Sequence, residues 1–338
     1  MLPKALSANY SYHNFMKKVT KIIAYAVIFV VVLVIAGASY VTLALPNVGD
    51  AENIKVNITP ERVAHGKYLA TSVALCVDCH SPHAVNKFAA PMDTTMVGAG
   101  GGKFTANEGF PGDVTVPNIT PYKIKDWTDG ELFRAITTGQ RKDGSAIFPL
   151  MPWPYYSKMD REDIYDIIAY IRTLKPVETS YPKSTLDFPL SIIVHTMPQK
   201  ATLGKRPNPK DTVRYGEYLV QSAACQECHS QDDKGVLIAG LEFAGGKEFV
   251  ANGHKIHTAN ITPDKATGIG NWSKQAFIAR FKAFTDPGAA QPVGKDDFQT
   301  IMPWYNYAKM SESDLTSIYA YLRTVKPVKN AVVKFAAN

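Results

Sequence analysis

The chain has 338 residues, of which 46% are hydrophobic and 20% are charged. This length and apolar content suit two domains of ordinary size and exclude an intrinsically disordered chain. The net charge is +7, but the basic residues form no single stripe or patch, which argues against binding to nucleic acid.

The first predicted element is a membrane-spanning helix over residues 22–45. This run of 24 residues contains no charged side chain. As an α-helix it would extend over roughly 36 Å, enough to cross a hydrocarbon core of about 30 Å. A cleaved signal peptide, whose apolar region is normally about 7 to 15 residues, and a buried helix of a globular core are the alternatives. We expect a retained anchor.

The orientation of this anchor follows from the lysines around it. Lys17, Lys18 and Lys21 precede the apolar run, and the next basic residue is Lys55. The positive-inside rule therefore predicts that residues 1–21 lie in the cytoplasm and that everything after the helix lies on the outer side. We expect a single-pass protein of the inner membrane whose C-terminal part is in the periplasm, beyond a linker over residues 46–59.

The rest of the chain contains the same unit twice, in the same order and with an offset between 142 and 151 residues. We predict one domain over residues 60–180 and a second over residues 210–330, followed by a tail over 331–338. The proline-rich stretch 181–209 is predicted to connect them. Its apolar run 190–194 is expected to pack on a domain, with a membrane-surface or partner contact as the alternative. The repeated segments are 65–69 and 215–219, 76–80 and 225–229, 118–121 and 260–263, 151–153 and 302–304, and 169–176 and 320–327.

Each unit is predicted to be mostly helical. In the first unit, one helix covers roughly residues 62–75, and another begins at Thr128, which forms a capping box with Glu131. The last helix begins at Asp160, and its isoleucines recur at helical spacing. A long loop over 90–121 separates the first two helices, and we expect it to wrap a large buried cofactor.

All four cysteines of the chain lie in two Cys-x-x-Cys-His motifs. Two cysteines at this spacing can each form a thioether to one edge of a porphyrin, and the adjacent histidine then lies under the iron. A zinc site needs four ligands, and one pair of cysteines would have to provide the whole site, because the two pairs are about 150 residues apart. A redox dithiol does not require the adjacent histidine. We therefore predict two c-type haems. The predicted attachment residues are Cys76, Cys79, Cys225 and Cys228, and the predicted proximal ligands are His80 and His229.

Two pairs of methionines recur in both units and are candidates for the sixth iron ligand. Met159 and Met310 precede the N-cap of the last helix, a position where an apolar residue commonly packs into the core. Met151 and Met302 lie in the loop before that helix, and each is followed by proline, which holds the preceding residue extended. We predict Met151 and Met302 as the ligands. The other histidines do not recur and are expected to be surface or packing residues.

These motifs resemble class I cytochrome c domains. The resemblance rests on Cys-x-x-Cys-His, the later Met-Pro, and terminal helices marked by a glycine and a tyrosine, Gly66 with Tyr170 and Gly216 with Tyr321. It implies a mostly α fold in which the first and last helices cross where the glycine lies close to an aromatic ring. The run 260–272, Met-Pro-Trp, and residues 188–190 are similar to the cytochrome c subunits of membrane-bound alcohol and aldehyde dehydrogenases.

The expected function is transfer of single electrons, without catalysis by this chain itself. The expected partners are the membrane and redox proteins, such as subunits of a respiratory or dehydrogenase complex that donate electrons and an oxidase or soluble cytochrome that accepts them. A di-haem peroxidase would need an open sixth position on one iron, which the recurrence of Met-Pro argues against. A terminal-oxidase subunit and a haem sensor are further alternatives, and only about twenty residues precede the helix to serve as an output domain.

Overall fold

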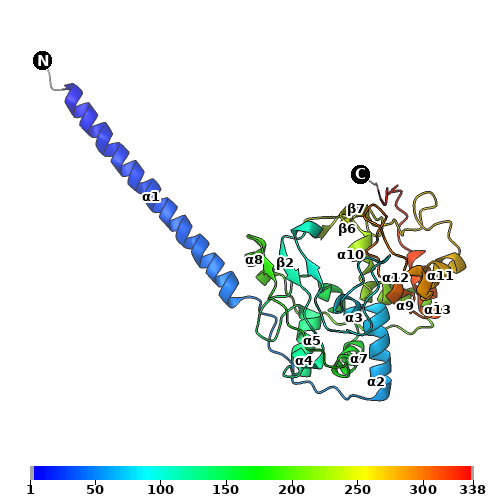
Figure 1. Cartoon of the computed structure of the whole chain (residues 1–338). Coiled ribbons are helices and arrows are strands. Elements are labelled where there is room, and N and C mark those ends of the chain that lie inside the picture. Colours follow the sequence, from blue (N-terminus) through cyan, green and yellow to red (C-terminus); the bar gives the residue numbers. More distant parts are fainter. Residues whose placement is uncertain (1–3, 336–338) are drawn as a thin grey trace.

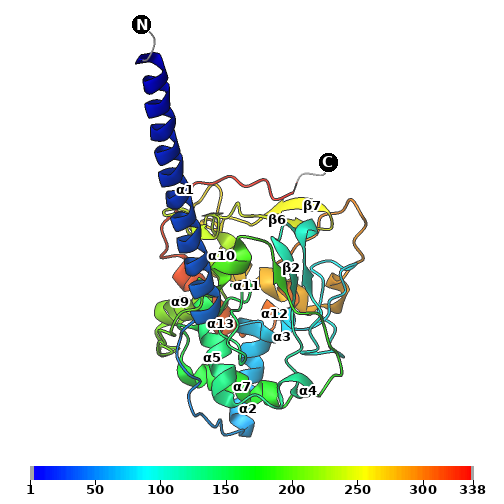
Figure 2. The ribbon, with the colours of Figure 1, turned by 90° about the vertical axis from the view of Figure 1, so that its left-hand side faces the viewer.

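The computed structural model describes residues 4–335. Helix α1 (Lys4–Ala44) extends away from the folded remainder as one rod, which both views show (Figures 1 and 2). Among the described residues, it is the one helix long and apolar enough to cross a membrane, and the apolar part spans Phe15–Ala44. It begins earlier than the predicted residue 22, because residues 4–21 contain no proline or glycine to stop it. Residues 1–3 of the predicted cytoplasmic segment and 336–338 of the predicted tail lie outside the described residues.

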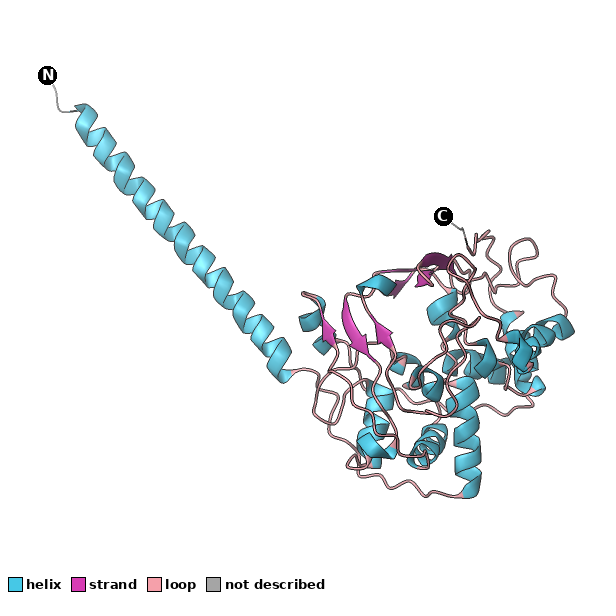
Figure 3. Ribbon diagram, in the orientation of Figure 1, coloured by secondary structure: helices cyan, strands magenta, loops and turns pink. Residues whose placement is uncertain are grey.

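The part that follows is mostly helical, as predicted, with short strands at its edge (Figure 3). We call residues 60–180 the first repeat and residues 210–330 the second repeat. The helical segments of the first repeat are α2 (Pro60–Tyr68), the π-helical turn η1 (Leu69–Val73), α3 (Cys76–Cys79), η2 (Ala106–Glu108), α4 (Pro121–Ile124), α5 (Asp129–Thr138), α6 (Trp153–Tyr156) and α7 (Arg161–Arg172). Those of the second repeat are α9 (Thr212–Ser222), α10 (Cys225–His229), α11 (Lys274–Lys282), η4 (Ala283–Thr285), η5 (Pro287–Ala289), α12 (Trp304–Tyr307) and α13 (Glu312–Leu322).

The sequence analysis did not predict the strands. The loop 90–121 contains β1 (Lys103–Phe104) and β2 (Gly112–Thr115), and the connection adds β3 (Thr185–Leu186), which pairs antiparallel with β2 through Gly112↔Leu186. The connection also contains α8 (Leu190–Ile193) and η3 (Val194–Thr196). In strands of two to four residues, the alternation of apolar and polar side chains is too short to be recognised in a sequence. The others, all in the second repeat, are β4 (Asp232–Asp233), β5 (Val236–Leu237), β6 (Glu248–Ala251) and β7 (His254–His257).

The predicted helix starts at Thr128 and Asp160 are confirmed, and the helix predicted over roughly residues 62–75 is formed by α2 and η1 over residues 60–73. Thr128 Oγ1 accepts from Glu131 N at 3.1 Å, and Glu131 Oε2 accepts from Thr128 N at 2.7 Å, which completes the capping box. Asp160 caps α7 by accepting from the backbone N–H of Glu162 at 2.8 Å. The isoleucines of α7 face inward, and Ile164, Ile167 and Ile168 are fully buried. One continuous hydrophobic core contains residues of both repeats.

In each repeat the first and last helices cross, and their backbones are in contact at a glycine of the first helix. A Cβ on Gly66 of α2 would lie 1.7 Å from the backbone oxygen of Asp166 in α7. A Cβ on Gly216 of α9 would lie 1.9 Å from the oxygen of Ser317 in α13 and 3.0 Å from Cβ of Tyr321. The three nearest atoms at Gly66 are all backbone and do not include Tyr170. Only glycine allows these helix backbones to approach so closely.

The two repeats hold each other through a reciprocal pair of tyrosines. Tyr218 of α9 donates to Asp163 of α7 at 2.5 Å and accepts from the N–H of Asp160 at 3.0 Å. Tyr68 of α2 donates to Asp314 of α13 and accepts from the N–H of Ser311 at 3.0 Å. Burial and the neighbouring carboxylate raise the pKa of both phenols, so each keeps the proton that it donates.

We predict that Gly66→Ala and Gly216→Ala each destabilise the folded part. Alanine is normally the better helix former by about 0.5–1 kcal/mol, but at these crossings the added methyl group meets backbone that has no room to move. A loss of about 1–3 kcal/mol in the free energy of unfolding is expected. Denaturant unfolding of the full chain, followed by circular dichroism, measures it.

Gly37→Ala is the matched control, because a Cβ at Gly37 meets no atom within 4 Å. Its unfolding should equal that of the unchanged chain. Equal stability of all three variants would contradict the close crossing.

Candidate functional site

Each Cys-x-x-Cys motif begins where the first helix of its repeat is interrupted by a left-handed residue. Leu75 has φ +54° before Cys76, and Ala224 has φ +50° before Cys225. The chain then makes a short helix, α3 or α10, which carries both cysteines. This turn places the two thiols of a pair on one short segment, directly ahead of the histidine.

All four thiols are free and half-buried. Burial raises the pKa of Cys76, Cys79 and Cys225 to about 12, and that of Cys228 to about 11. The thiols are therefore neutral at physiological pH. The reactive thiol of a redox dithiol is usually set among groups that lower this pKa. The pairs instead have the character of buried, uncharged groups that pack against an apolar surface.

The two motif histidines make the same hydrogen bond. Nδ1 of His80 lies 2.7 Å from the carbonyl oxygen of Pro117, and Nδ1 of His229 lies 2.7 Å from that of Ala259. A carbonyl only accepts, so the proton is on Nδ1 and the lone pair is on Nε2. Burial lowers the pKa of both imidazoles. Each histidine is thus held neutral with Nε2 available to a metal, the usual arrangement for a ligand histidine and its supporting carbonyl.

The repeated Asn-Ile-Thr-Pro segment positions these carbonyls. Asn118 directly follows Pro117; its Nδ2 donates to the oxygen of Val177 at 2.8 Å, and its Oδ1 accepts from the N–H of Thr120 at 2.7 Å. Asn260 does the same with Val328 at 2.8 Å and Thr262 at 2.9 Å. The sequence showed that the segment recurs but did not reveal this role, because the partners lie about sixty residues away.

The loop with the predicted methionine ligand packs beside the cysteine turn of the same repeat. Met151 and Met302 are partly buried against the core and lead into α6 and α12. Tyr156 of α6 donates to the oxygen of Ala74 at 2.6 Å, and Tyr307 of α12 donates to that of Ala223 at 3.0 Å. Met159 and Met310 are fully buried core residues directly before the N-caps of α7 and α13, as predicted for them.

These observations fit a covalently attached haem in each repeat. The neutral thiols suit thioether bonds, the neutral imidazole offers Nε2, and the tyrosine contacts bring the methionine loop and the cysteine turn together. These features come from the same positions of both repeats.

The loop before Met302 is held by the first repeat. The side chain of Gln299 is buried. Its Oε1 accepts from the N–H groups of Ala89 at 2.8 Å and Thr300 at 3.0 Å, and its Nε2 donates to the oxygen of Lys87 at 2.9 Å. The hydroxyl of Thr300 in turn accepts from the N–H of Met302 at 3.1 Å. Segment 85–89, which follows the first motif, therefore supports the ligand loop of the second.

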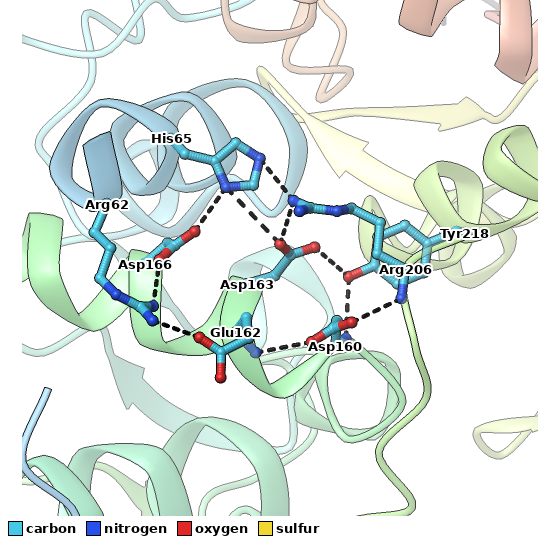
Figure 4. A network of polar contacts seen from close by, with 8 residues as sticks. All are labelled: Arg62, His65, Asp160, Glu162, Asp163, Asp166, Arg206 and Tyr218. Atoms are coloured by element: carbon cyan, nitrogen blue, oxygen red, sulfur yellow. Dashed lines mark hydrogen bonds and ion pairs between the residues drawn. The ribbon is translucent and has the colours of Figure 1, made fainter. Parts of the chain in front are cut away.

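His65 belongs to an ion-pair network that sequence reasoning missed (Figure 4). Its Nδ1 lies 2.8 Å from Asp166, and its Nε2 lies 3.1 Å from Nη1 of Arg206, which also pairs with Asp163 at 2.7 Å. His65, Asp163 and Asp166 lie close enough together for a metal, but arginines already pair with both carboxylates, Arg62 with Asp166 at 2.6 Å. The network ties the connection to α2 and α7. Its only signal in the sequence is the pair of acidic residues on the inner face of a helix.

Comparison with known proteins agrees with this chemistry. The family model described as cytochrome c matches residues 213–326. The chain is 29% identical over 232 residues to the cytochrome c subunit of a quinone alcohol dehydrogenase from Gluconacetobacter polyoxogenes, which covers 64% of this chain and 49% of that protein. It is 28% identical over 296 residues to a fructose dehydrogenase cytochrome subunit from Gluconobacter japonicus, 82% of this chain and 55% of the relative.

A third relative is similar over nearly its whole length. It is a protein named diheme cytochrome c-type from Cereibacter sphaeroides, 25% identical over 311 residues, which are 88% of this chain and 96% of that protein. By contrast, the chain spans about half the length of the two dehydrogenase subunits. The second repeat therefore matches the cytochrome c family, and the chain is similar to the cytochrome c subunits of quinone alcohol dehydrogenase and fructose dehydrogenase.

Proposed function

We propose that this protein is a membrane-anchored di-haem cytochrome c that passes single electrons on the outer side of the membrane. The observation that carries the proposal is the identical setting of the two motif histidines. His80 and His229 each present Nε2 because Nδ1 is bonded to a carbonyl at 2.7 Å. The matched family domain covers the second of these sites. Because the first has the same sequence motif and the same local contacts, we infer a second haem there and two tandem cytochrome c domains.

We assign the haem contacts residue by residue. Cys76 and Cys79 would attach one haem and Cys225 and Cys228 the other, with His80 and His229 as proximal ligands and Met151 and Met302 as distal ligands. Held between imidazole and thioether, the haem would supply one-electron chemistry at a raised potential. The carbonyls of Pro117 and Ala259 fix the imidazole rings, and the packed methionine loops would keep other ligands away from a bound haem iron.

We infer that α1 anchors these domains to the inner membrane. Its most apolar stretch is not buried against the folded part, and this exposure would be costly in water. The lysines before it place the N-terminus in the cytoplasm. A signal sequence is also an apolar N-terminal helix, but this one is longer than such sequences require.

We further infer that the chain works beside a dehydrogenase. Two relatives are named as cytochrome subunits of alcohol and fructose dehydrogenases. This chain would then carry electrons from such a partner, or from another respiratory donor, to an oxidase or a soluble cytochrome. Stable association with a partner subunit, tested by purification from the membrane at native levels, would support that assignment.

The first prediction from this proposal concerns the sixth ligands. The reduced protein should show no spectral change with carbon monoxide, because both distal positions are filled. Met302→Leu should open one haem, so that carbon monoxide binds at half of the sites, and Met151→Leu should open the other.

Met310→Leu and Met159→Leu are the controls. Both replace fully buried core methionines with a residue of similar volume, so they should leave the spectrum unchanged at a modest cost in stability. Carbon monoxide binding to the unchanged protein would point to an open iron and to an enzymatic role. A response in the controls would mean that the ligands have been assigned to the wrong methionines.

The second prediction concerns Gln299. Gln299→Ala leaves the buried N–H of Ala89 without a partner, at a cost of about 1–3 kcal/mol, whereas the carbonyl of Lys87 still accepts from the N–H of Ala90 at 2.9 Å. It should lower stability and let carbon monoxide reach part of the second haem, because the loop of Met302 loosens.

Gln291→Ala is the matched control: within residues 4–335 the Gln291 side chain bonds only to nearby Gly288, and the backbone oxygen at position 291 keeps its bond from the N–H of Phe88 at 2.8 Å. It should behave as the unchanged protein. If Gln299→Ala alters neither stability nor carbon monoxide binding, the first repeat does not support this loop.

A further inference from the structure

The segment 187–195 of the connection lies beside the end of α1. Helix α8 and the turn η3 both contact α1, and Figure 1 shows α8 next to the point where α1 meets the folded part. Nδ1 of His195 lies 3.1 Å from the carbonyl oxygen of Leu45, and Val194 is buried. The end of the segment is thus fixed to the base of the helix.

The start of the segment is fixed as well. Leu186 pairs with Gly112 in the small sheet, and the N–H of Asp187 donates to the oxygen of Pro111 at 3.1 Å. The N–H of Ser191 donates back to the oxygen of Asp187 at 2.9 Å. The residues between these attachments therefore have a defined position relative to α1.

Apolar side chains on this fixed segment face outward. Phe188 is 80% exposed and Ile193 is 46% exposed. On the last turns of α1, Tyr40 is 63% exposed and Leu43 is 86% exposed. Single exposed apolar residues are ordinary on protein surfaces. Here, however, they gather where an apolar helix leaves the folded part, at the level where the bilayer surface would lie.

We propose that Phe188 and α8 form a second membrane contact, in the boundary between headgroups and acyl chains on the outer side of the bilayer. This inference rests on the proposed anchoring of the chain by α1. Aromatic and aliphatic side chains are stabilised in this boundary region, where the hydrocarbon begins and polar backbone still meets water. A helix of four residues whose two ends are bonded to the domain is long enough for this boundary region, because a surface contact does not require a helix that crosses the hydrocarbon core.

The contact would fix the domain relative to the membrane. A single helix leaves the attached domain free to rotate about the helix axis and to tilt. A second contact point beside the helix removes much of that freedom, and it presents the same face of the electron-transfer domain to partners in the membrane.

The test is spin labelling of the full chain in phosphatidylethanolamine and phosphatidylglycerol nanodiscs. A cysteine introduced by Phe188→Cys carries a nitroxide, and its collision rates with oxygen, which concentrates in lipid, and with a water-soluble nickel chelate are compared. Leu43→Cys on α1 is the lipid reference. Ile58→Cys is the water reference, because Ile58 is apolar and 55% exposed just before α2, a helix that lies well apart from the end of α1 in Figure 1. The parent chain treated with the same reagent corrects for labelling of native cysteines.

We expect the ratio of oxygen to chelate collisions at position 188 to resemble that at position 43 and to exceed that at position 58 several-fold. A ratio at 188 equal to that at 58, with lipid contact at 43, would overturn the second contact while leaving the anchor intact. Water contact at 43 as well would overturn the anchor and the second contact together.

Discussion

The close crossing of the first and last helices in each repeat is the constraint on which the rest of the structure depends. Gly66 and Gly216 let two helix backbones approach to a distance that no side chain would allow. The first helix of each crossing leads directly into the cysteine turn. The loop that leads into the last helix carries Met151 or Met302. Fixing the crossing therefore fixes both ends of the proposed axial coordination, although neither glycine belongs to the site.

The same crossing also sets the contact between the repeats. Tyr68 and Tyr218 follow these glycines by two residues and reach the first turn of the last helix in the opposite repeat. Arg206 adds a bond from the connection to Asp163, and Gln299 links the loop after the first motif to the loop before Met302. The buried carboxylate of Asp163 and the buried amide of Gln299 each bond to several groups across or beside this interface, which makes the relative position of the repeats specific.

The local features of the fold could be read from the sequence, whereas the contacts between distant segments could not. The cap at Asp160, the capping box at Thr128 and the inward isoleucines of α7 are encoded within a few residues, and they were predicted. The hydrogen bonds of Asn118, His65 and Gln299 join residues that are about sixty to more than two hundred positions apart. No local sequence pattern therefore predicts these bonds. The strands were missed because they are short and are stabilised by each other. The boundaries of two tandem domains and the haem ligands remain predictions.

The reciprocal tyrosine contact has the form of the interface in a two-fold symmetric dimer, in which each partner offers the same residue to the same site. In a true dimer, any substitution changes both halves of the interface at once. Here the two copies lie in one chain and can vary one at a time, so Asp160 in one copy is matched by Ser311 in the other. The stretch before Met302 is also longer than its counterpart before Met151, which accounts for the rise of the offset from 142 residues at Asn118 and Asn260 to 151 residues at the two methionines. Because the two copies are joined in one chain, the residues around one site can differ from those around the other, and so can the properties of the two sites. The contact between the repeats is kept.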